Sequence, residues 1–458
     1  MTRPRLSSIF SVVATAALMV SLTIAPASAR NLDEPEAPPL SAAVSGAITG
    51  RVLIEPFGGG TPQPSNEGQV QFWAASGGPM VPTAVATLNP SGTFSISGLP
   101  AGQYRVAFIS RDSIALPVRE WHSNKLFSVI ANVVTLANGA AFAFGDVVLE
   151  ERTVGSQRFA GDNRYATATA ISTNFLGPGD ERDIVIVNGQ NFPDALGAGP
   201  LATVLRGPLL MVTQSSIPAE TAAELDRLNP LSITIVGGTG VVSSEVEAQL
   251  AGYVGGSSNV TRIAGSNRYA TSRAIVEALD NRSPITELFI ATGGGFPDAL
   301  SAVPAAGSVG GAVLLVNGGL SALDDSTASY IDGLNVPVTI VGGTGVVSAG
   351  IQNQLVNRGV AVGRVAGSDR YATSIAIARG YFPYAEFAYL ANGLGFADAL
   401  AIGPWAAAGR SPVYLTQPTC ITDAVFDDLI DGLYRNVVLV GGTGVLSTRV
   451  AAIEPCTL

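Results

Sequence analysis

The chain has 458 residues, of which 47% are hydrophobic and 13% are charged, so it carries enough apolar material for several buried cores. Acidic residues outnumber basic ones 35 to 25, which argues against a nucleic-acid-binding protein, a class that usually has a basic excess. The single histidine, His122, and two cysteines leave few ligands for a His/Cys metal site, so no metal or cofactor is expected.

The first 29 residues predict a secretory signal peptide. Arg3 and Arg5 form a basic start, residues 9–24 form an apolar core, and residues 27–29 read Ala-Ser-Ala, a small-residue cleavage site. A membrane anchor is the alternative interpretation, but the apolar run is short and no second run follows. We therefore expect a secreted protein without an integral membrane segment.

Residues 30–43 are rich in proline and acidic side chains, which is typical of an extended linker. Residues 44–150 alternate short apolar runs with Gly/Pro turns, a pattern that predicts an all-β sandwich. Residues 91–106 read SGTFSISGLPAGQYRV, which resembles the hairpin of carboxypeptidase-regulatory-like (prealbumin-like) domains. The resemblance implies an accessory module without an active site, which could bind a protein or a glycan.

The rest of the chain is an internal repeat in which three sequence blocks recur in the same order. The blocks are Arg-φ-Ala-Gly-x-(Asn/Asp)-Arg-Tyr-Ala-Thr, where φ is apolar, Phe-x-Asp-Ala-Leu, and φ-Val-Gly-Gly-Thr-Gly-Val-φ-Ser. They begin at Arg158, Arg262 and Arg364, at Phe192, Phe296 and Phe396, and at Ile235, Ile340 and Leu439. We therefore divide this part of the chain into three modules, residues 158–257, 258–360 and 361–458.

Within a module, short apolar runs alternate with helical patterns. In the first module the predicted strands are residues 184–187, 208–212 and 232–236, and the predicted helices are residues 195–205 and 219–228. Fully apolar strands alternating with helices indicate a parallel sheet covered on both faces, in a flavodoxin-like or Rossmann-like α/β unit. Residues 260–263 are expected to supply a strand shared between modules. The third module, with no repeat after it, is expected to lack such a strand.

The three blocks resemble the cell-wall-binding repeat 2 family, and the resemblance covers most of the repeat region. It implies non-covalent attachment to an anionic cell-wall polymer, teichoic-type or another secondary wall polysaccharide, by three modules around a pseudo-threefold axis at the cell surface. In that family a Pro-φ-Leu-Leu segment is linked to anchoring. Pro208, Leu209 and Leu210 match this segment, whereas residues 312–315 and 412–415 depart from it.

Six repeated arginines are candidate polymer-binding residues, because a guanidinium fork suits phosphate and carboxylate groups. They are Arg158, Arg164, Arg262, Arg268, Arg364 and Arg370. The alternative is structural: the second arginine of each block pairs with its own module's aspartate, Asp194, Asp298 or Asp398, and locks the loops together.

The glycine turns at Gly237, Gly342 and Gly441 are predicted to be tight turns, with an anion-binding nest of backbone N–H groups as the alternative. They match neither nucleotide-binding glycine motif. The repeated aspartates stand at predicted helix starts. We therefore interpret them as N-caps or arginine partners, and not as the acids of a glycosidase.

Cys420 and Cys456 both lie in the third module and predict a disulfide in an extracellular protein, with free thiols as the alternative. No catalytic motif accompanies the repeats. The sequence therefore predicts a non-catalytic cell-wall-binding protein. A peptidoglycan hydrolase of the amidase type and a surface adhesin remain the alternatives.

Overall fold

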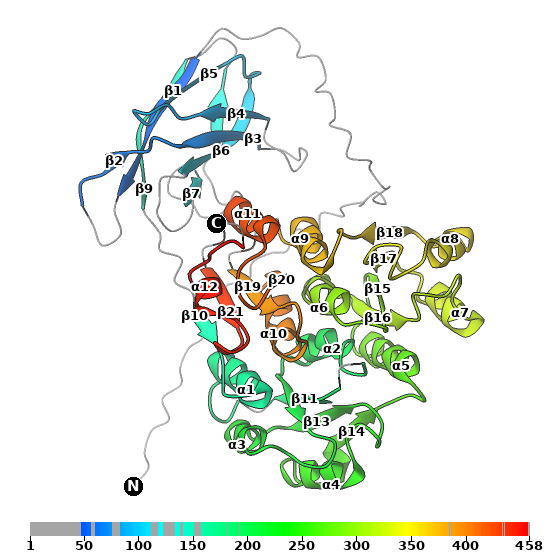
Figure 1. Ribbon diagram of the computed structural model, residues 1–458. Helices are drawn as coiled ribbons and strands as arrows, with labels where there is room; N and C mark the ends of the chain where they lie inside the picture. Colours follow the sequence, from blue (N-terminus) through cyan, green and yellow to red (C-terminus); the bar gives the residue numbers. More distant parts are fainter. Residues whose placement is uncertain are drawn as a thin grey trace, which may run out of the picture.

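The computed structural model describes residues 47–55, 60–75, 83–110, 118–121, 133–137, 141–150, 157–180, 182–191, 193–383, 385, 387–432, 434 and 436–456. The predicted signal peptide and linker and His122 lie outside these residues. An N-terminal group of strands precedes three α/β units that surround a common centre (Figure 1). Within the described residues, no helix combines the length and the apolar character needed to cross a membrane.

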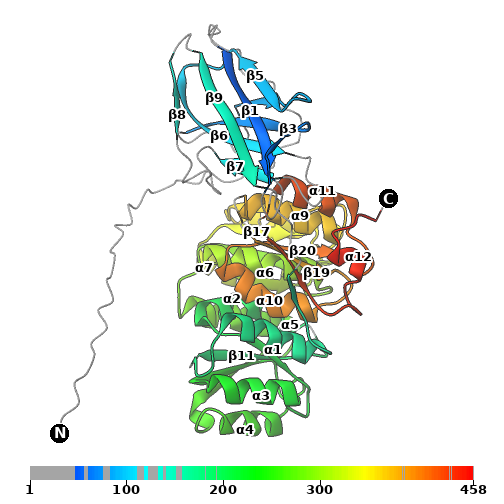
Figure 2. The ribbon, with the colours of Figure 1, turned by 90° about the vertical axis from the view of Figure 1, so that its left-hand side faces the viewer.

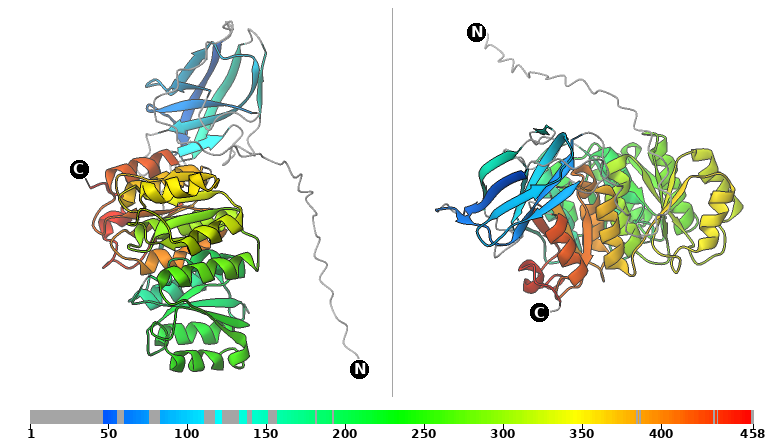
Figure 3. Two further views of the ribbon diagram at one scale, coloured as in Figure 1. Left: turned by 90° about the vertical axis from the view of Figure 1, so that its right-hand side faces the viewer. Right: turned by 90° about the horizontal axis from the view of Figure 1, so that it is seen from above.

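The N-terminal strands form two sheets that share one hydrophobic core. One sheet contains β2 (Gln63–Pro64), β1 (Ala47–Glu55), β5 (Thr93–Ser97) and β9 (Phe142–Glu150). The other contains β4 (Ala84–Thr87), β3 (Gly68–Ala74), β6 (Gly102–Ser110), β7 (Val118–Trp121) and β8 (Val134–Leu136). Val52, Phe72 and Phe108 pack in the core between the sheets, and the domain lies beside the third module, nearest its helix α11 (Figures 2 and 3).

The first module contains a four-stranded parallel sheet in the order β12-β11-β13-β14. Its strands are β11 (Asp183–Asn188), β12 (Leu209–Val212), β13 (Ser232–Val236) and β14 (Val260–Ile263). Its helices are α1 (Arg164–Phe175), α2 (Ala198–Leu205), α3 (Ala219–Leu228) and α4 (Ser244–Gly252), followed by the 3₁₀ turn η2 (Ser257–Asn259). The order follows the first strands of the flavodoxin-like arrangement, so the parallel α/β prediction is confirmed.

The second and third modules repeat this arrangement. The second contains β15 (Leu288–Thr292), β16 (Ala312–Val316), β17 (Val338–Val341) and β18 (Val362–Val365), with α5 (Arg268–Asp280), α6 (Pro297–Val309), α7 (Asp325–Leu334) and α8 (Ala349–Asn357). The third contains β19 (Phe387–Asn392), β20 (Val413–Thr416) and β21 (Asn436–Val440), with α9 (Arg370–Tyr381), α10 (Ala397–Ala408), α11 (Asp423–Gly432) and α12 (Thr448–Ala451). The inner strands are buried because helices cover both faces of each sheet.

In each of the three module sheets, the fourth strand belongs to a different repeat from the other three strands. Strand β14 opens the second repeat but pairs with β13, and β18 opens the third repeat but pairs with β17. Strand β10 (Gln157–Phe159) opens the first repeat and pairs in parallel with β21 of the third module. The expectation that the third module lacks a shared strand is therefore wrong, because the ring closes and the start of the repeat region completes the last sheet.

Helices α2, α6 and α10, one from each module, pack against one another at the centre of the ring (Figure 1). Their contact depends on small residues. A Cβ atom at Gly199 would lie 2.2 Å from the Val303 side chain, and one at Gly403 would lie 2.7 Å from it. Val303 of α6 therefore fills the space that two glycines leave on the neighbouring helices, which fixes how closely the three modules approach.

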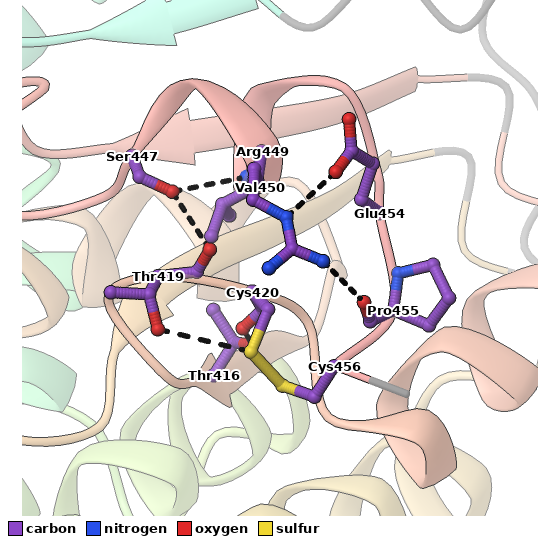
Figure 4. The surroundings of a disulfide bond; sticks show 9 residues. All are labelled: Thr416, Thr419, Cys420, Ser447, Arg449, Val450, Glu454, Pro455 and Cys456. Atoms are coloured by element: carbon purple, nitrogen blue, oxygen red, sulfur yellow. Dashed lines mark hydrogen bonds and ion pairs between the residues drawn. A yellow bond between two sulfur atoms is a disulfide. The ribbon is translucent and has the colours of Figure 1, made fainter. Parts of the chain in front are cut away.

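The predicted disulfide between Cys420 and Cys456 is confirmed, with a Cα–Cα distance of 5.0 Å (Figure 4). The surrounding chain is held by further bonds: the Cys456 N–H donates to the Ile421 carbonyl at 2.8 Å, and Arg449 donates to Glu454 at 2.7 Å. The bridge thus ties the segment after α12 to the segment before α11.

We expect C420S/C456S to unfold more easily than the oxidised protein, because the bridge closes a segment of 36 residues and restricts the unfolded chain. In the chain-entropy picture the loss is about 3–4 kcal/mol of unfolding free energy. Equilibrium denaturation of the oxidised, reduced and C420S/C456S proteins measures it. Equal midpoints for all three would contradict the assignment of a stabilising role.

Candidate functional site

A groove lies where the third module meets the first, at the carboxyl ends of three parallel strands. It encloses about 880 Å³ and is lined by residues 160–164 after β10, residues 392–398 after β19 and residues 442–445 after β21. The strand order β20-β19-β21-β10 changes direction between β19 and β21. Open α/β sheets bind ligands at this point, because the loops diverge there to opposite faces. The ring places corresponding loops at the other two module boundaries.

The first arginine of each block holds the glycine turn of the preceding module. Its Nη1 donates to the carbonyl of the first glycine of that turn: Arg158 to Gly441 at 2.5 Å, Arg262 to Gly237 at 2.7 Å, and Arg364 to Gly342 at 2.6 Å. Burial lowers the pKa of Arg158 and Arg364 from their usual value. These arginines therefore fix the turns, and Arg158 also lines the groove.

The second arginine of each block holds a loop of its own module. Arg164 donates to the Gly189 carbonyl, Arg268 to Gly293 at 2.6 Å and Arg370 to Gly393 at 2.5 Å. Across the boundary, the guanidinium of Arg164 lies 5.5 Å from the centre of the Phe396 ring in the third module. Arg370 faces Phe296 of the second module in the same way, at 5.9 Å. The guanidinium groups of Arg164 and Arg370 therefore contact two modules each.

The carboxylates that face these arginines belong to the neighbouring module, which corrects the expectation of pairing within a module. Asp398 of the third module interacts with the charge of Arg164 of the first, and Asp298 of the second with Arg370 of the third. Strand exchange is the physical reason, since it carries the start of each repeat onto the preceding sheet. Neither pair approaches within 4.0 Å among the ion pairs of the described residues.

The environment of these two aspartates favours the protonated carboxyl group. Burial raises the pKa of both Asp298 and Asp398 to about 6, although the facing arginine and a threonine hydroxyl act in the opposite direction. The threonines are Thr373 for Asp298 and Thr167 for Asp398. The groove therefore contains a carboxyl group, that of Asp398, whose pKa of about 6 lies above the ordinary aspartate value of 3.8.

The repeated aspartates are predicted to be N-caps or arginine partners, and the N-cap interpretation is wrong, whereas Asp298 and Asp398 do face an arginine. Helices α6 and α10 are capped at Phe296 and Phe396, without a side-chain hydrogen bond, and Asp298 and Asp398 lie in the first turn. Asp194 precedes α2, which begins at Ala198. The carboxylates turn toward the glycine turns instead of toward the helix N–H groups, because the turns approach them closely.

The glycine turns need glycine for two reasons. Gly237, Gly342 and Gly441 have φ angles of 111°, 103° and 118°, a region that other residues rarely adopt. A Cβ atom at Gly441 would also lie 2.6 Å from Asp398 Oδ2. These observations support the tight-turn interpretation. In the following residues of the third-module turn, 442–444, the backbone N–H groups have no acceptor among the hydrogen bonds of the described residues.

Pro208, Leu209 and Leu210 are not at a surface, which corrects their prediction as polymer-contacting residues. All three are buried, and Leu209 and Leu210 lie in strand β12 with exposed fractions of 1% and 0%. Their apolar side chains pack between the helices that cover both faces of the sheet.

The sequence analysis missed three kinds of residue at this site. Asn163 caps helix α1 by accepting from the backbone N–H groups of Tyr165 and Ala166. Phe396 stacks under Arg164, and Thr167 supports Asp398. All three positions recur within the repeated blocks, so recurrence was the available signal. Within the described residues, no group of three or more His, Cys, Asp or Glu side chains could hold a metal ion.

Comparison with known proteins agrees with this architecture. Residues 158–247, 262–352 and 364–451 match the family described as Cell wall binding domain 2 (CWB2). Two curated relatives come from Bacillus subtilis (strain 168). The N-acetylmuramoyl-L-alanine amidase LytC is 29% identical over 320 residues, 70% of this chain and 61% of the relative. The amidase enhancer is 29% identical over 296 residues, 64% of this chain and 39% of the relative.

Among solved structures, Cwp6 from Clostridium difficile is similar with a TM-score of 0.59 and 23% identity, over 85% of this chain and 64% of that chain. The chain thus spans less than two thirds of the length of these three proteins. Its fold and repeats define a cell-wall-binding protein built from tandem α/β modules. The chain belongs to the Cell wall binding domain 2 family, with three tandem copies of the domain.

We expect Gly441→Ala to destabilise the protein by about 1–3 kcal/mol, because alanine strains the backbone there and its Cβ meets Asp398. Gly444→Ala in the same turn is the control, since a Cβ atom there meets nothing within 4 Å, and its effect stays within about 0.5 kcal/mol. Thermal unfolding of both variants provides the measurement. Equal melting temperatures would refute the geometric argument.

A second prediction concerns pH and stability. The pKa of Asp298 and Asp398 is about 6 in the folded protein, above the ordinary aspartate value of 3.8 that applies in the unfolded chain. Their protonation therefore stabilises the folded protein fully below about pH 4, and this stabilisation is lost as pH rises through about 6. Relative to the unsubstituted protein, D298N/D398N should therefore gain melting temperature as pH rises from about 4 to 7.

Asp324→Asn is the control of opposite sign. Hydrogen bonds from Ser326 and Thr327 hold the pKa of Asp324 at about 2, below the ordinary value of 3.8. The ionised carboxylate therefore stabilises the folded protein fully above about pH 4, and this stabilisation is lost as pH falls through about 2. The melting temperature of D324N should therefore lie furthest below that of the unsubstituted protein at pH 7, and the difference should shrink in acid. A constant difference in melting temperature between D298N/D398N and the unsubstituted protein across pH 4–7 would disprove the raised pKa of the two aspartates.

Proposed function

We propose that the protein is a secreted, non-catalytic attachment protein that binds an anionic cell-wall polymer non-covalently in the grooves between its modules. The observation that carries the proposal is the groove between the third and first modules, at the strand ends where α/β sheets bind ligands. Its lining combines Arg158 and Arg164 with the backbone of the third glycine turn.

Local charge supports an anionic ligand although the whole chain has a net charge of -10. Arg158 donates to the carbonyls of Gly441 and Leu446, and Arg164 donates to a loop carbonyl of its own module. These bonds fix each guanidinium without neutralising its charge. The amide groups of residues 442–444 add N–H donors of the kind that surround anions in backbone nests. Attraction therefore comes from a small preorganised region of the surface and not from overall charge.

The threefold repetition supports binding by avidity. A long polymer that occupies one groove meets the next groove at a high effective concentration, so three weak contacts give strong attachment. The central helices and the exchanged strands hold the corresponding loops of the three module boundaries in a fixed arrangement about a pseudo-threefold axis. Such repetition suits an anchoring protein better than an enzyme, which needs one reactive site.

An amidase-type peptidoglycan hydrolase is the second candidate, because both curated relatives carry amidase in their names. The matched part of this chain includes the repeats, which are a binding family. Release of new amino groups from purified walls measures hydrolysis, and our proposal expects none.

We propose that the N-terminal strands form a β-sandwich accessory module of the carboxypeptidase-regulatory-like kind. Its two sheets and single core support this assignment. Display of this module on the wall surface would expose it to a protein or glycan, which connects the proposal to the adhesin alternative.

Glutamate in the glycine turns should abolish attachment. Gly240, Gly345 and Gly444 occupy corresponding positions, and a Cβ atom at each meets nothing within 4 Å. We expect G240E/G345E/G444E to fold normally but to lose co-sedimentation with purified walls, because three negative charges face the polymer. Each single variant should show a partial loss, and binding by the unsubstituted protein should weaken as salt rises.

The matched control is G240Q/G345Q/G444Q, which adds side chains of the same size without charge. It should retain wall binding within a few-fold of the unsubstituted protein. Equal binding by the glutamate and glutamine triple variants would exclude the grooves as the site of anion binding.

A further inference from the structure

Asp398 lines the groove between the third and first modules, and Asp298 occupies the corresponding position at the boundary between the second and third modules. Asp298 and Asp398 face a guanidinium across a module boundary without closing on it as an ion pair among the described residues. We propose that Asp298 and Asp398 are polymer-contacting residues that bind in their protonated form, each donating its O–H to an anionic oxygen held by the arginine opposite. This inference rests on the proposed function and adds a chemical role for these two residues.

The Asp398 carboxyl group is in contact with Thr167 and with the glycine turn, and a ligand approaches it from the groove. The Gly161 N–H donates to Thr167 Oγ1 at 3.2 Å, so the threonine hydroxyl hydrogen is available to the Asp398 carboxyl group. The Oδ2 atom of Asp398 lies against Gly441. The remaining approach is the groove itself, which Asp398 lines together with Arg164.

The second aspartate repeats this geometry at the next boundary. The Gly367 N–H donates to Thr373 Oγ1 at 3.1 Å, and Thr373 supports Asp298. A Cβ atom at Gly342 would lie 2.5 Å from Asp298 Oδ2, and Arg370 faces the carboxyl group. The same arrangement at two boundaries indicates that it is built by the repeat and is not an accident of one loop.

The charged groups around each carboxyl decide the direction of the pH effect. Asp398 faces Arg164 and shares the groove lining with Arg158 and Asp162, and Asp298 faces Arg370. Burial already raises the pKa of Asp398 to about 6 in spite of the arginine. An anionic oxygen beside it disfavours the carboxylate further, so the bound complex retains the proton and binding takes up a proton at neutral pH.

The ligand chemistry is therefore an oxygen that stays anionic in weak acid, such as a phosphodiester or a uronate. Protonation of the aspartate removes a like charge and supplies a donor at the same atom. Affinity should rise as pH falls through about 6 and should be lower above that value, because the carboxylate then repels the polymer.

The test uses the full chain with two probes, poly(glycerol phosphate) and polygalacturonate, at constant ionic strength between pH 5 and pH 8. Calorimetry in two buffers of different ionisation enthalpy gives both the affinity and the number of protons taken up. For whichever probe binds, we expect affinity at least about tenfold higher at pH 5 than at pH 8, since tenfold corresponds to a single unit of pKa shift on binding. We also expect proton uptake at pH 7.

Two variants make the test specific. D298N/D398N keeps a donor without a titrating group, so it should bind at pH 8 as the unsubstituted protein does at pH 5, without proton uptake. The matched control is D226N/D427N, which makes the same charge change at exposed positions on α3 and α11. It should keep the pH dependence and the proton uptake.

The outcomes separate this inference from the proposed function. Binding of walls or of either probe with no pH dependence, together with unchanged behaviour of D298N/D398N, would overturn the inference and leave the proposed function intact. Absence of binding to walls and to both probes at every pH would overturn the proposed function itself. Equal loss of pH dependence in D226N/D427N would also overturn the inference, because the effect would then be one of general charge.

Discussion

Parallel pairing between the first strand of one repeat and the sheet of the preceding one is the interaction on which the rest of this structure depends. The three-residue strand β10 completes the sheet of the third module. Its Arg158 donates to the carbonyl of Gly441, which lies 283 residues further along the chain. Because the exchange occurs at every boundary, no module is an independent unit. The groove between the third and first modules exists because loops from two repeats meet at the carboxyl ends of the strands of one sheet.

The repeated arginines show how one residue type serves structure and binding together. A guanidinium has five N–H donors in a rigid fork, so it can satisfy a backbone carbonyl and still present charge to a ligand. Each of the six donates to a glycine carbonyl, which fixes the loops that form the grooves. Removing such an arginine would therefore disturb both the loop structure and the contact with the polymer. Substitution of the turn glycines at which a Cβ atom meets nothing within 4 Å changes the surface charge without disturbing the loops.

Electrostatics in the grooves depends on burial more than on the number of charges. The chain is acidic as a whole, yet the arginines stay in place because backbone carbonyls and aromatic rings hold them. The facing aspartates lose hydration without gaining a close ion pair, so their pKa rises to about 6 and a larger share of them is protonated in weak acid than for an ordinary aspartate. Charge at the surface of each groove is therefore set by the approach of two modules and not by the composition of either one.

The sequence by itself determined the repeats, the apolar strands and the cysteine pair, because periodic apolar runs and turn residues act locally and need no knowledge of what lies across the sheet. It did not determine which aspartate faces Arg164, nor that β10 closes the ring. Similar blocks in three repeats allow pairing within or between modules, and only packing selects one. It also left Leu209 as a candidate contact, although an apolar strand segment is buried whenever helices cover both faces of its sheet. Tertiary structure decided the partner of Arg164 and the closure of the ring because each depends on residues that lie far apart in the chain, which local propensities do not connect.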